Sequence, residues 1–333
     1  MAQMRLTLML PGALTPTALA AELGAALQAP TLGRIVARAT PAGEWSASDE
    51  DPAPDDHWLA REVFGTHGRA PTAPYAWAAL TGRRETSQMI WRADPIHIAL
   101  GRDSLIVHSL HDAPLSEAEA EDLLAAANEL CADAQCELQR VGDEWFMRSA
   151  QPWSLRPPPL TAMAGAPLPL PAMSSADTLR WSRLHNAIQM RWHAHPVNEA
   201  RETRGLPIVN GLWLHGGGTW NPLTHMPWPR VHSNRPELRG AAHAAGAHAG
   251  TSDTTPDGDA LLVWDDALRA SLNADWPAWL AAMASIDRRL AALPKAEFEL
   301  VLSGRHRLRH WHTRPVDRLK LWRHHSLAEV LAE

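Results

Sequence analysis

The sequence contains few cysteines and no long apolar run. Cys131 and Cys136 lie close together without a second pair, so neither a disulfide framework nor a four-ligand zinc site is indicated. No run of about eighteen apolar residues occurs, so we expect no membrane-spanning helix. Pro11, Gly12 and Pro16 interrupt the apolar start of the chain, which leaves it too short for a signal peptide. We therefore expect a cytoplasmic protein that does not contact a membrane.

The sequence also lacks the short motifs of several enzyme classes. Gly-x-Ser-x-Gly, a Walker loop, Gly-x-Gly-x-x-Gly and His-Glu-x-x-His are all absent. The chain has 18 histidines, but His185 and His193 would lie about 12 Å apart along a helix, too far for one metal ion. We therefore expect no dedicated metal site and no cofactor.

Tryptophan dominates the aromatic residues, with 16 Trp against 3 Phe and 1 Tyr. Because buried tryptophans contribute large apolar areas, we expect many of them in the core. The chain has 333 residues, of which 45% are hydrophobic and 20% charged. This composition is typical of a globular protein with roughly two domains.

Charge is distributed unevenly along the chain. Residues 303–325 carry seven basic side chains and one acidic one, on a chain with a net charge of −6. Such a segment can bind an anion or nucleic acid. Because Arg305, Arg307 and Arg309 alternate and no nucleic-acid motif is present, we favour a solvated edge strand instead.

The order of predicted elements indicates an α/β domain interrupted by a smaller module. Strands predicted near the start and end of the chain alternate with helices, the clearest of which begins after Asp275. Between them, a hairpin, a helix opened by the capping box of Ser116 and Glu119, and a second hairpin form an α+β unit. We predict a core domain over 1–88 and 174–333, and an inserted module with a proline-rich linker over 89–173.

Residues 185–218 combine polar side chains with obligatory glycine more densely than the rest of the chain. A helix ending at Pro196 precedes a short turn that Asn198 can cap. Leu206–Leu214 then predicts a strand buried on both faces, with Gly216–Gly218 directly after it. Ligands collect at the carboxyl ends of strands in open α/β sheets, so this segment is the predicted binding region, with Arg201 placed to meet an anion.

Several segments together resemble a bacterial family of RpfE-type regulatory proteins, which is itself similar to the archaeal-type cofactor-independent phosphoglycerate mutases. The resemblance is carried by Trp91–His97, Asn186–Met190, His195–Asn198, Arg201–Glu202 and Asn210–Gly218. It spans roughly residues 75–240 well and the remainder loosely. It implies an alkaline-phosphatase-like core sheet with flanking helices and an inserted small α+β module.

The same resemblance implies a metal centre that this sequence does not reproduce. The enzymes hold two divalent ions with Asp and His side chains, beginning with an Asp-Gly pair at the end of the first strand. Here that strand ends Leu10-Pro11-Gly12, and no aspartate precedes Asp49. Later ligands would fall around 264–310, where no Asp-His pair occurs. Phosphoryl transfer through two metals is therefore not expected.

Three hypotheses follow. The first is a non-catalytic regulatory or binding homologue, with an unidentified protein partner or a small anionic ligand. The second is a phosphotransferase or hydrolase with ligands relocated among Asp94, His97, Asp265, Asp266 and His310. The third is binding of an anion or nucleic acid through residues 303–325. For the first, the predicted ligand-binding residues are Asp94, His97, Asn198, Arg201, Asn210, Trp213, Gly216, Gly217 and Gly218.

Overall fold

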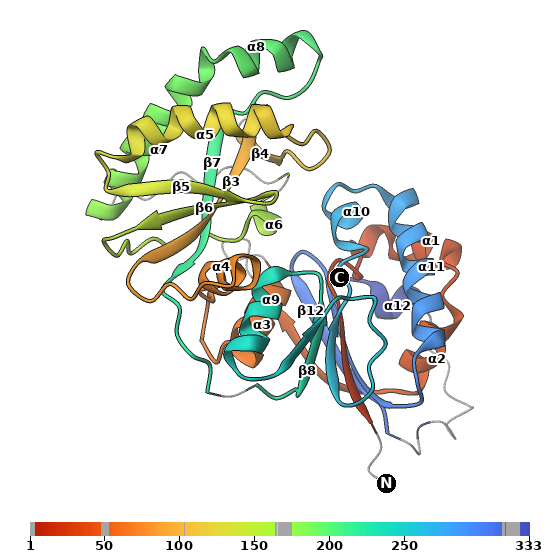
Figure 1. The fold of residues 1–333 in the computed structure, drawn as a ribbon. Helices are drawn as coiled ribbons and strands as arrows, with labels where there is room; N and C mark the ends of the chain where they lie inside the picture. Colours follow the sequence, from red (N-terminus) through yellow and green to blue (C-terminus); the bar gives the residue numbers. More distant parts are fainter. Residues whose placement is uncertain are drawn as a thin grey trace. The chain divides into compact units, whose positions relative to one another are not determined.

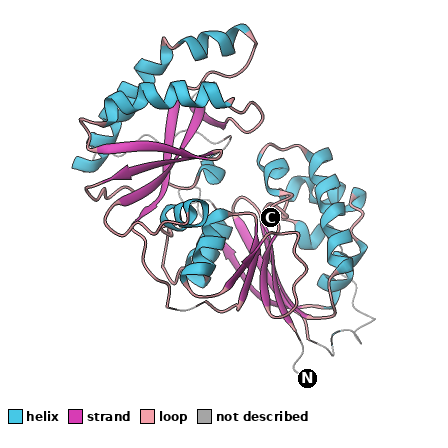
Figure 2. Cartoon of the chain, in the orientation of Figure 1, coloured by secondary structure: helices cyan, strands magenta, loops and turns pink. Residues whose placement is uncertain are grey.

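The computed structural model describes residues 4–47, 53–102, 104–163, 165, 175–224, 226–314, 317 and 327–333. The chain divides into two compact units. Unit 1 combines Met1–Gly68 with Pro222–Glu333, and unit 2 is Arg69–Asn221. Each unit contains its own sheet and its own helices (Figures 1 and 2).

Unit 1 is built on a seven-stranded sheet. Its strands are β1 (Arg5–Leu10), β2 (Thr40–Ser46), β8 (Arg230–Ser233), β9 (His248–Gly250), β10 (Ala260–Val263), β11 (Glu297–Ser303) and β12 (Arg307–His312). Its helices are α1 (Thr17–Ala26), α2 (Pro30–Arg38), α3 (Pro54–Glu62), α9 (Pro236–Ala244), α10 (Leu268–Leu272), α11 (Trp276–Ala292) and α12 (Leu327–Leu331). The strand order is β2-β12-β11-β1-β10-β8-β9. Strands β11, β1, β10, β8 and β9 run parallel, β12 pairs antiparallel with β11, and β2 pairs antiparallel with β12.

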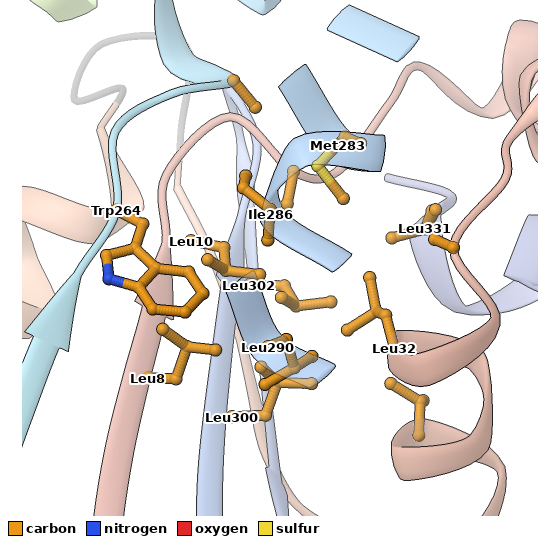
Figure 3. Close-up of a cluster of buried hydrophobic side chains, with 14 of the residues drawn as sticks. Leu8, Leu10, Leu32, Trp264, Met283, Ile286, Leu290, Leu300, Leu302 and Leu331 are labelled. Atoms are coloured by element: carbon orange, nitrogen blue, oxygen red, sulfur yellow. The ribbon is translucent and has the colours of Figure 1, made fainter. Parts of the chain in front are cut away.

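Alternation along β1 directs side chains to both faces of this sheet. Leu8 and Leu10 belong to a core that α1, α2, α11 and α12 cover, as Figure 3 shows for part of that cluster. In α11, Ile286 and Leu290 are four residues apart and enter the same core, as helical periodicity predicts. The predicted buried first strand and the helix after Asp275 are therefore both confirmed, and the Asp275 carboxylate caps α11 by accepting from the Ala278 amide at 3.1 Å.

The opposite face of the sheet packs against α3 and the segment before β8. Trp58 of α3 lies with its ring centroid 5.8 Å from that of Trp228. The indole Nε1 of Trp228 donates to the Thr7 hydroxyl at 2.8 Å, which satisfies a polar group in an otherwise apolar layer. The Pro-, Ser- and Asp-rich composition of residues 40–56 is typical of an exposed loop, but the described part of this range contains β2 and the start of α3.

Unit 2 contains a five-stranded antiparallel sheet. Its strands are β3 (Met89–Leu100), β4 (Leu105–Ser109), β5 (Cys136–Val141), β6 (Glu144–Ser149) and β7 (Gly211–Gly218). Its helices are α4 (Ala73–Thr81), α5 (Glu117–Cys131), α6 (Leu160–Met163), α7 (Ala176–His193) and α8 (Pro196–Thr203). The predicted hairpins and the Ser116 capping box are confirmed. In the core, Trp192 of α7 stacks edge-on against Trp145 and donates to the Leu123 carbonyl at 3.0 Å.

The mixed α/β class, with a mostly parallel sheet and a second smaller sheet, is confirmed. The boundaries of the units differ from the predicted core over 1–88 and 174–333 and the predicted module over 89–173. Helices α7 and α8 and strand β7 belong to unit 2 rather than to the core, because β7 pairs with β3 along most of its length. An antiparallel partner cannot be distinguished from a parallel one by an apolar run alone.

Two local predictions need correction. Asn198 does not cap α8; its N-cap is His195, whose ring accepts from the Val197 amide. Strand β12 is not the sheet edge, because β2 pairs with it on the outer side. Arg307 and Arg309 form ion pairs with Glu44 of β2 at 3.2 and 3.8 Å.

Of the basic segment 303–325, only 303–314 and 317 lie within the described residues, so Arg318, Lys320 and Arg323 fall outside them.

No helix in the described part of the chain combines the length and the apolar character that crossing a membrane requires. Cys131 and Cys136 are free thiols.

Candidate functional site

All nine residues predicted to bind a ligand lie in unit 2. Two of them are asparagines whose side chains form hydrogen bonds with backbone groups. The Asn198 side chain donates to the carbonyls of Trp192 and Val209 and accepts from the Val209 amide, each at 2.8 Å. Asn210 accepts from the Ile98 amide at 2.6 Å and donates to the Ile98 carbonyl at 2.9 Å. Both amide groups therefore hold strands and helices together, which accounts for their polarity.

Arg201 is fully buried and likewise makes structural contacts. Its guanidinium donates to the carbonyls of Pro207, Ala113 and Pro114 at 2.9, 2.6 and 3.4 Å. It also donates to the Glu119 carboxylate at 3.2 Å. This arginine was predicted to meet an anion, and the anion that it contacts in the described structure belongs to the protein itself.

Trp213 and His97 contact backbone carbonyls as well. The indole Nε1 of Trp213 donates to the Pro158 carbonyl at 2.8 Å. The His97 ring nitrogen Nδ1 lies 2.9 Å from the Ile208 carbonyl. His97 and Asn210 thus secure the same stretch of β3 against the segment that leads into β7.

Gly216–Gly218 lie inside β7 and not in a loop after a strand, which corrects the prediction. A Cβ atom on Gly217 would overlap the indole ring of Trp91, and one on Gly218 would overlap Pro71. Gly216 has a φ of +63°, in the left-handed region that favours glycine. The three glycines therefore permit close packing within unit 2.

Asp94 pairs with the titratable side chain of His215, which was not among the residues predicted from the sequence. Its Oδ2 lies 2.7 Å from the Nε2 of His215, and the two side chains are 20% and 12% exposed. Burial alone would raise the pKa of Asp94, but His215 and Arg92 more than offset this and lower it. The ligand-binding role of the nine residues stays a prediction, and this partly exposed pair is where it is best tested.

A different polar cluster lies where the parallel strands of unit 1 end. In open α/β sheets this edge collects ligands. Strand β8 is followed by Asn234 and Arg235, and strand β10 by Trp264, Asp265 and Asp266. Sequence reasoning noted the two aspartates but missed Arg235. The available signal was an arginine two residues after a short strand and directly before a proline-started helix.

Arg235 is held by three aspartates from two other segments. Its Nη2 lies 2.7 Å from the Asp265 carboxylate and 3.1 Å from that of Asp55, and its Nη1 lies 3.7 Å from that of Asp56. Asp55 and Asp56 occupy the first turn of α3. With all groups ionised, one positive charge faces three negative ones. We refer to these four residues as the Arg235 cluster.

The pKa values reflect this imbalance. Burial is the largest influence on Asp56 and raises its pKa, Asp55 raises it further, and Arg235 only partly opposes them. The Asp56 Oδ2 is buried without a hydrogen-bond partner in the described structure. Burial by itself would lower the pKa of Arg235, but the three carboxylates raise it, so this guanidinium is permanently charged.

A second arginine binds the remaining acids at this edge. Arg289 of α11 lies 2.9 Å from Asp266 and 3.5 Å from Asp253, and donates to the Ser252 carbonyl at 2.8 Å. Its guanidinium also covers the Trp264 ring, 4.2 Å from the centroid. Asp265 and Asp266 are thus each paired with an arginine.

The residues at this edge do not fit a pair of divalent ions. Leu10, Pro11 and Gly12 offer no donor side chain at the end of β1. The carboxylates nearby are engaged by Arg235 and Arg289. Within the described ranges, no group of three or more His, Cys, Asp or Glu side chains has a geometry that could hold a metal ion.

The five residues of the second hypothesis are divided between the two units. Asp94 and His97 belong to unit 2, and Asp265, Asp266 and His310 to unit 1. His310 lines a separate cavity of about 430 Å³ together with Trp45 and residues of α3. Burial lowers the pKa of His310, which keeps its ring neutral near pH 7.

Comparison with known proteins supports the fold. No protein-family model matches the sequence, and no curated protein matches it. The solved structure of the PH0037 protein from Pyrococcus horikoshii is similar, with a TM-score of 0.57 and 14% identity; the match covers 98% of this chain and 92% of that one. A cofactor-independent phosphoglycerate mutase from Thermoplasma acidophilum is also similar, with a TM-score of 0.46 and 14% identity over 98% of this chain and 94% of that one. At this identity the likeness to the PH0037 protein shows the fold alone.

Proposed function

We propose that this protein is a non-catalytic, binding homologue of the cofactor-independent phosphoglycerate mutases, with a regulatory role. The observation that carries the proposal is the Arg235 cluster at the carboxyl edge of the parallel sheet. The resemblance of the sequence to those enzymes implies divalent ions in such a place, and here an arginine side chain supplies the positive charge.

The chemical difference between the two kinds of cation supports this function. A bound divalent ion activates a nucleophile by lowering its pKa and polarises a phosphoryl oxygen. A guanidinium offers only hydrogen-bond donors and a fixed charge, and those of Arg235 already point at carboxylates. The cluster is therefore suited to holding the ends of β8, β10 and α3 together beside a binding surface.

A direct assay for phosphoryl transfer tests the proposal. Purified protein is incubated with 3-phosphoglycerate and added Mn²⁺ or Zn²⁺, and its metal content is measured. We expect no conversion to 2-phosphoglycerate and no stoichiometric divalent ion. Conversion that is abolished by Asp265→Asn would overturn the proposal and favour the enzyme hypothesis.

A substitution at the cluster gives a second readout. Arg235→Met keeps much of the volume but leaves three carboxylates without their cation, so we expect a loss of roughly 3–5 kcal/mol in unfolding free energy. Added Mn²⁺ should restore part of the thermal stability of this variant and leave the parent protein unchanged. Arg239→Met is the matched control, because Arg239 lies in α9, the helix that Arg235 precedes, and has only weak contacts to carbonyls at 3.4 and 3.5 Å. A metal response equal in parent and variant would contradict a role for Arg235 as the internal cation.

We further propose a reducing, cytoplasmic setting and a protein partner or small anionic ligand. The free thiols Cys131 and Cys136 support the setting. Cell fractionation, with alkylation of free thiols before lysis, tests it: thiols found oxidised in the native protein would contradict this setting.

A further inference from the structure

A cavity of about 370 Å³ in unit 1 lies away from the Arg235 cluster, among α2, the end of α11, the start of β11 and the segment after β12. Its volume falls within the range of about 300–1,000 Å³ that is typical of small-molecule sites. None of the nine predicted ligand-binding residues lines it, but Arg314 and Asp317 of the basic segment 303–325 do. The charge of its lining differs from that of the chain as a whole.

Four basic side chains line this cavity, on a chain with a net charge of −6: Arg34, Arg38, Lys295 and Arg314. The acidic residue among its lining residues is Asp317, which is buried and accepts from the Arg314 backbone amide at 2.7 Å. The cavity therefore has a strong excess of positive charge.

These cations have no acidic partner in the described structure. No ion pair or hydrogen bond is formed there by the side chains of Arg38, Lys295 and Arg314, and Arg34 contacts only Pro30 and Thr31 of its own helix. Arg34 and Arg38 are four residues apart on α2, a spacing at which like charges destabilise a helix. A bound anion would relieve this repulsion.

The rest of the lining is apolar. Ile35, Leu293 and Phe298 pack against the hydrophobic core while lining the cavity. Phe298 is held in place by Thr313, whose hydroxyl accepts from the Phe298 amide at 2.7 Å and donates to its carbonyl at 3.2 Å. A ligand that fits this lining has one strongly anionic end and one apolar or aromatic body.

We propose that this cavity binds a small organic phosphate, such as a nucleoside monophosphate. Arg38, Lys295 and Arg314 would bind the phosphate, since guanidinium and ammonium groups form strong, charge-assisted hydrogen bonds to phosphate oxygens. The Phe298 side chain would contact the apolar body. This site is independent of the proposed function at the carboxyl edge, so either can fail without the other.

Titration calorimetry on the full chain tests the site with AMP, inorganic phosphate, adenosine and a short single-stranded oligonucleotide. We expect AMP to bind more tightly than phosphate, adenosine not to bind, and the oligonucleotide to bind no better than AMP. Absence of AMP binding overturns the proposal. Equal affinity for AMP and inorganic phosphate would overturn the proposed contact with the apolar body of the ligand. Tighter binding of the oligonucleotide than of AMP would overturn the small-molecule site in favour of nucleic-acid binding.

Variants locate the binding. Arg38→Gln and Lys295→Gln should each weaken AMP binding about tenfold or more, because each removes a charged hydrogen-bond donor. Both positions are partly or fully exposed, so we expect both variants to fold, which circular dichroism checks. Arg288→Gln, exposed on α11 but outside the cavity lining, should leave the affinity unchanged. Equal losses in all three variants would show non-specific attraction and overturn the site.

Discussion

Each unit holds one arginine among several hydrogen-bonding partners, but the two arginines have different surroundings. Arg201 is fully buried, and the Arg235 side chain is 14% exposed. Arg201 of unit 2 faces three backbone carbonyls and shares one carboxylate, that of Glu119, with Arg204. Arg235 of unit 1 faces three carboxylates. With all groups ionised, the first arrangement has two positive charges on one carboxylate, whereas the second leaves an excess of negative charge. The presence of an arginine inside a unit therefore does not by itself indicate a functional site. The balance of charges around it has to be considered as well.

The largest expected effect concerns Arg201. Arg201→Met should lower the unfolding free energy of unit 2 by roughly 3–5 kcal/mol, because three carbonyls lose their donor and Glu119 loses its buried partner. Chemical denaturation followed by hydrogen exchange in α8 measures it. Arg204→Ala, at a side chain that is 52% exposed, should cost less than about 1 kcal/mol. If both cost the same, the structural role assigned to Arg201 is wrong.

The next effect is a pH dependence in unit 2. Burial lowers the pKa of His185 to about 4, and its Nε2 accepts from the Leu212 amide at 3.2 Å. Between pH 4 and 6.5 the unfolded chain binds more protons, so stability is full above pH 6.5 and falls as the pH decreases, by roughly 3 kcal/mol in all. Hydrogen exchange in β7 at several pH values should show this slope. His185→Gln should flatten it, and His193→Gln, exposed on the same helix, should not.

Packing at the glycines of β7 gives a smaller effect. Gly217→Ala should destabilise unit 2 by roughly 1–3 kcal/mol, because the buried Trp91 ring must move to admit a methyl group. Gly43→Ala in unit 1, where a Cβ would meet nothing within 4 Å, is the control and should be near neutral. Thermal denaturation compares the two. A neutral Gly217→Ala would mean that the glycine is not required for packing and would return it to the ligand hypothesis.

The smallest expected effect is a pH dependence of stability in unit 1, with the opposite sign to that of His185. The pKa of Asp56 is raised, so at pH values just above the ordinary pKa of an aspartate the folded state binds more protons than the unfolded chain. The free energy of unfolding therefore rises as the pH falls toward that ordinary pKa. Asp56→Asn should remove this slope and change stability at neutral pH by less than about 1 kcal/mol. Asp253→Asn, at an 83% exposed side chain, should retain the slope. An unchanged slope in Asp56→Asn would mean that Asp56 does not carry the excess charge.

Local elements were predictable because their signals are local. The capping box at Ser116, the periodic apolar face of α11 and the two hairpins of unit 2 each depend on residues a few positions apart. The α/β class followed from the alternation of such elements along the chain. The absence of a donor side chain at Leu10–Gly12 was also visible in the sequence.

The pairing of β7 was not predictable from the sequence. Its apolar run indicated a buried strand, yet the partner strand β3 begins more than one hundred residues earlier, and the glycines serve contacts with Trp91 and Pro71. The nine residues were predicted to bind a ligand, but the side chains of Asn198, Arg201 and Asn210 form hydrogen bonds with the backbone.

The sequence by itself determined the type and order of most elements, the fold class and the lack of enzyme motifs, because each depends on neighbouring residues. Only the tertiary structure brought Asp55, Arg235 and Asp265 together. Only it showed Arg38 and Lys295 at one cavity, without acidic partners among the described residues. The physical reason is that a charge acts through distance in space. Residues separated by 180 positions in the chain, such as Asp55 and Arg235, lie 3.1 Å apart.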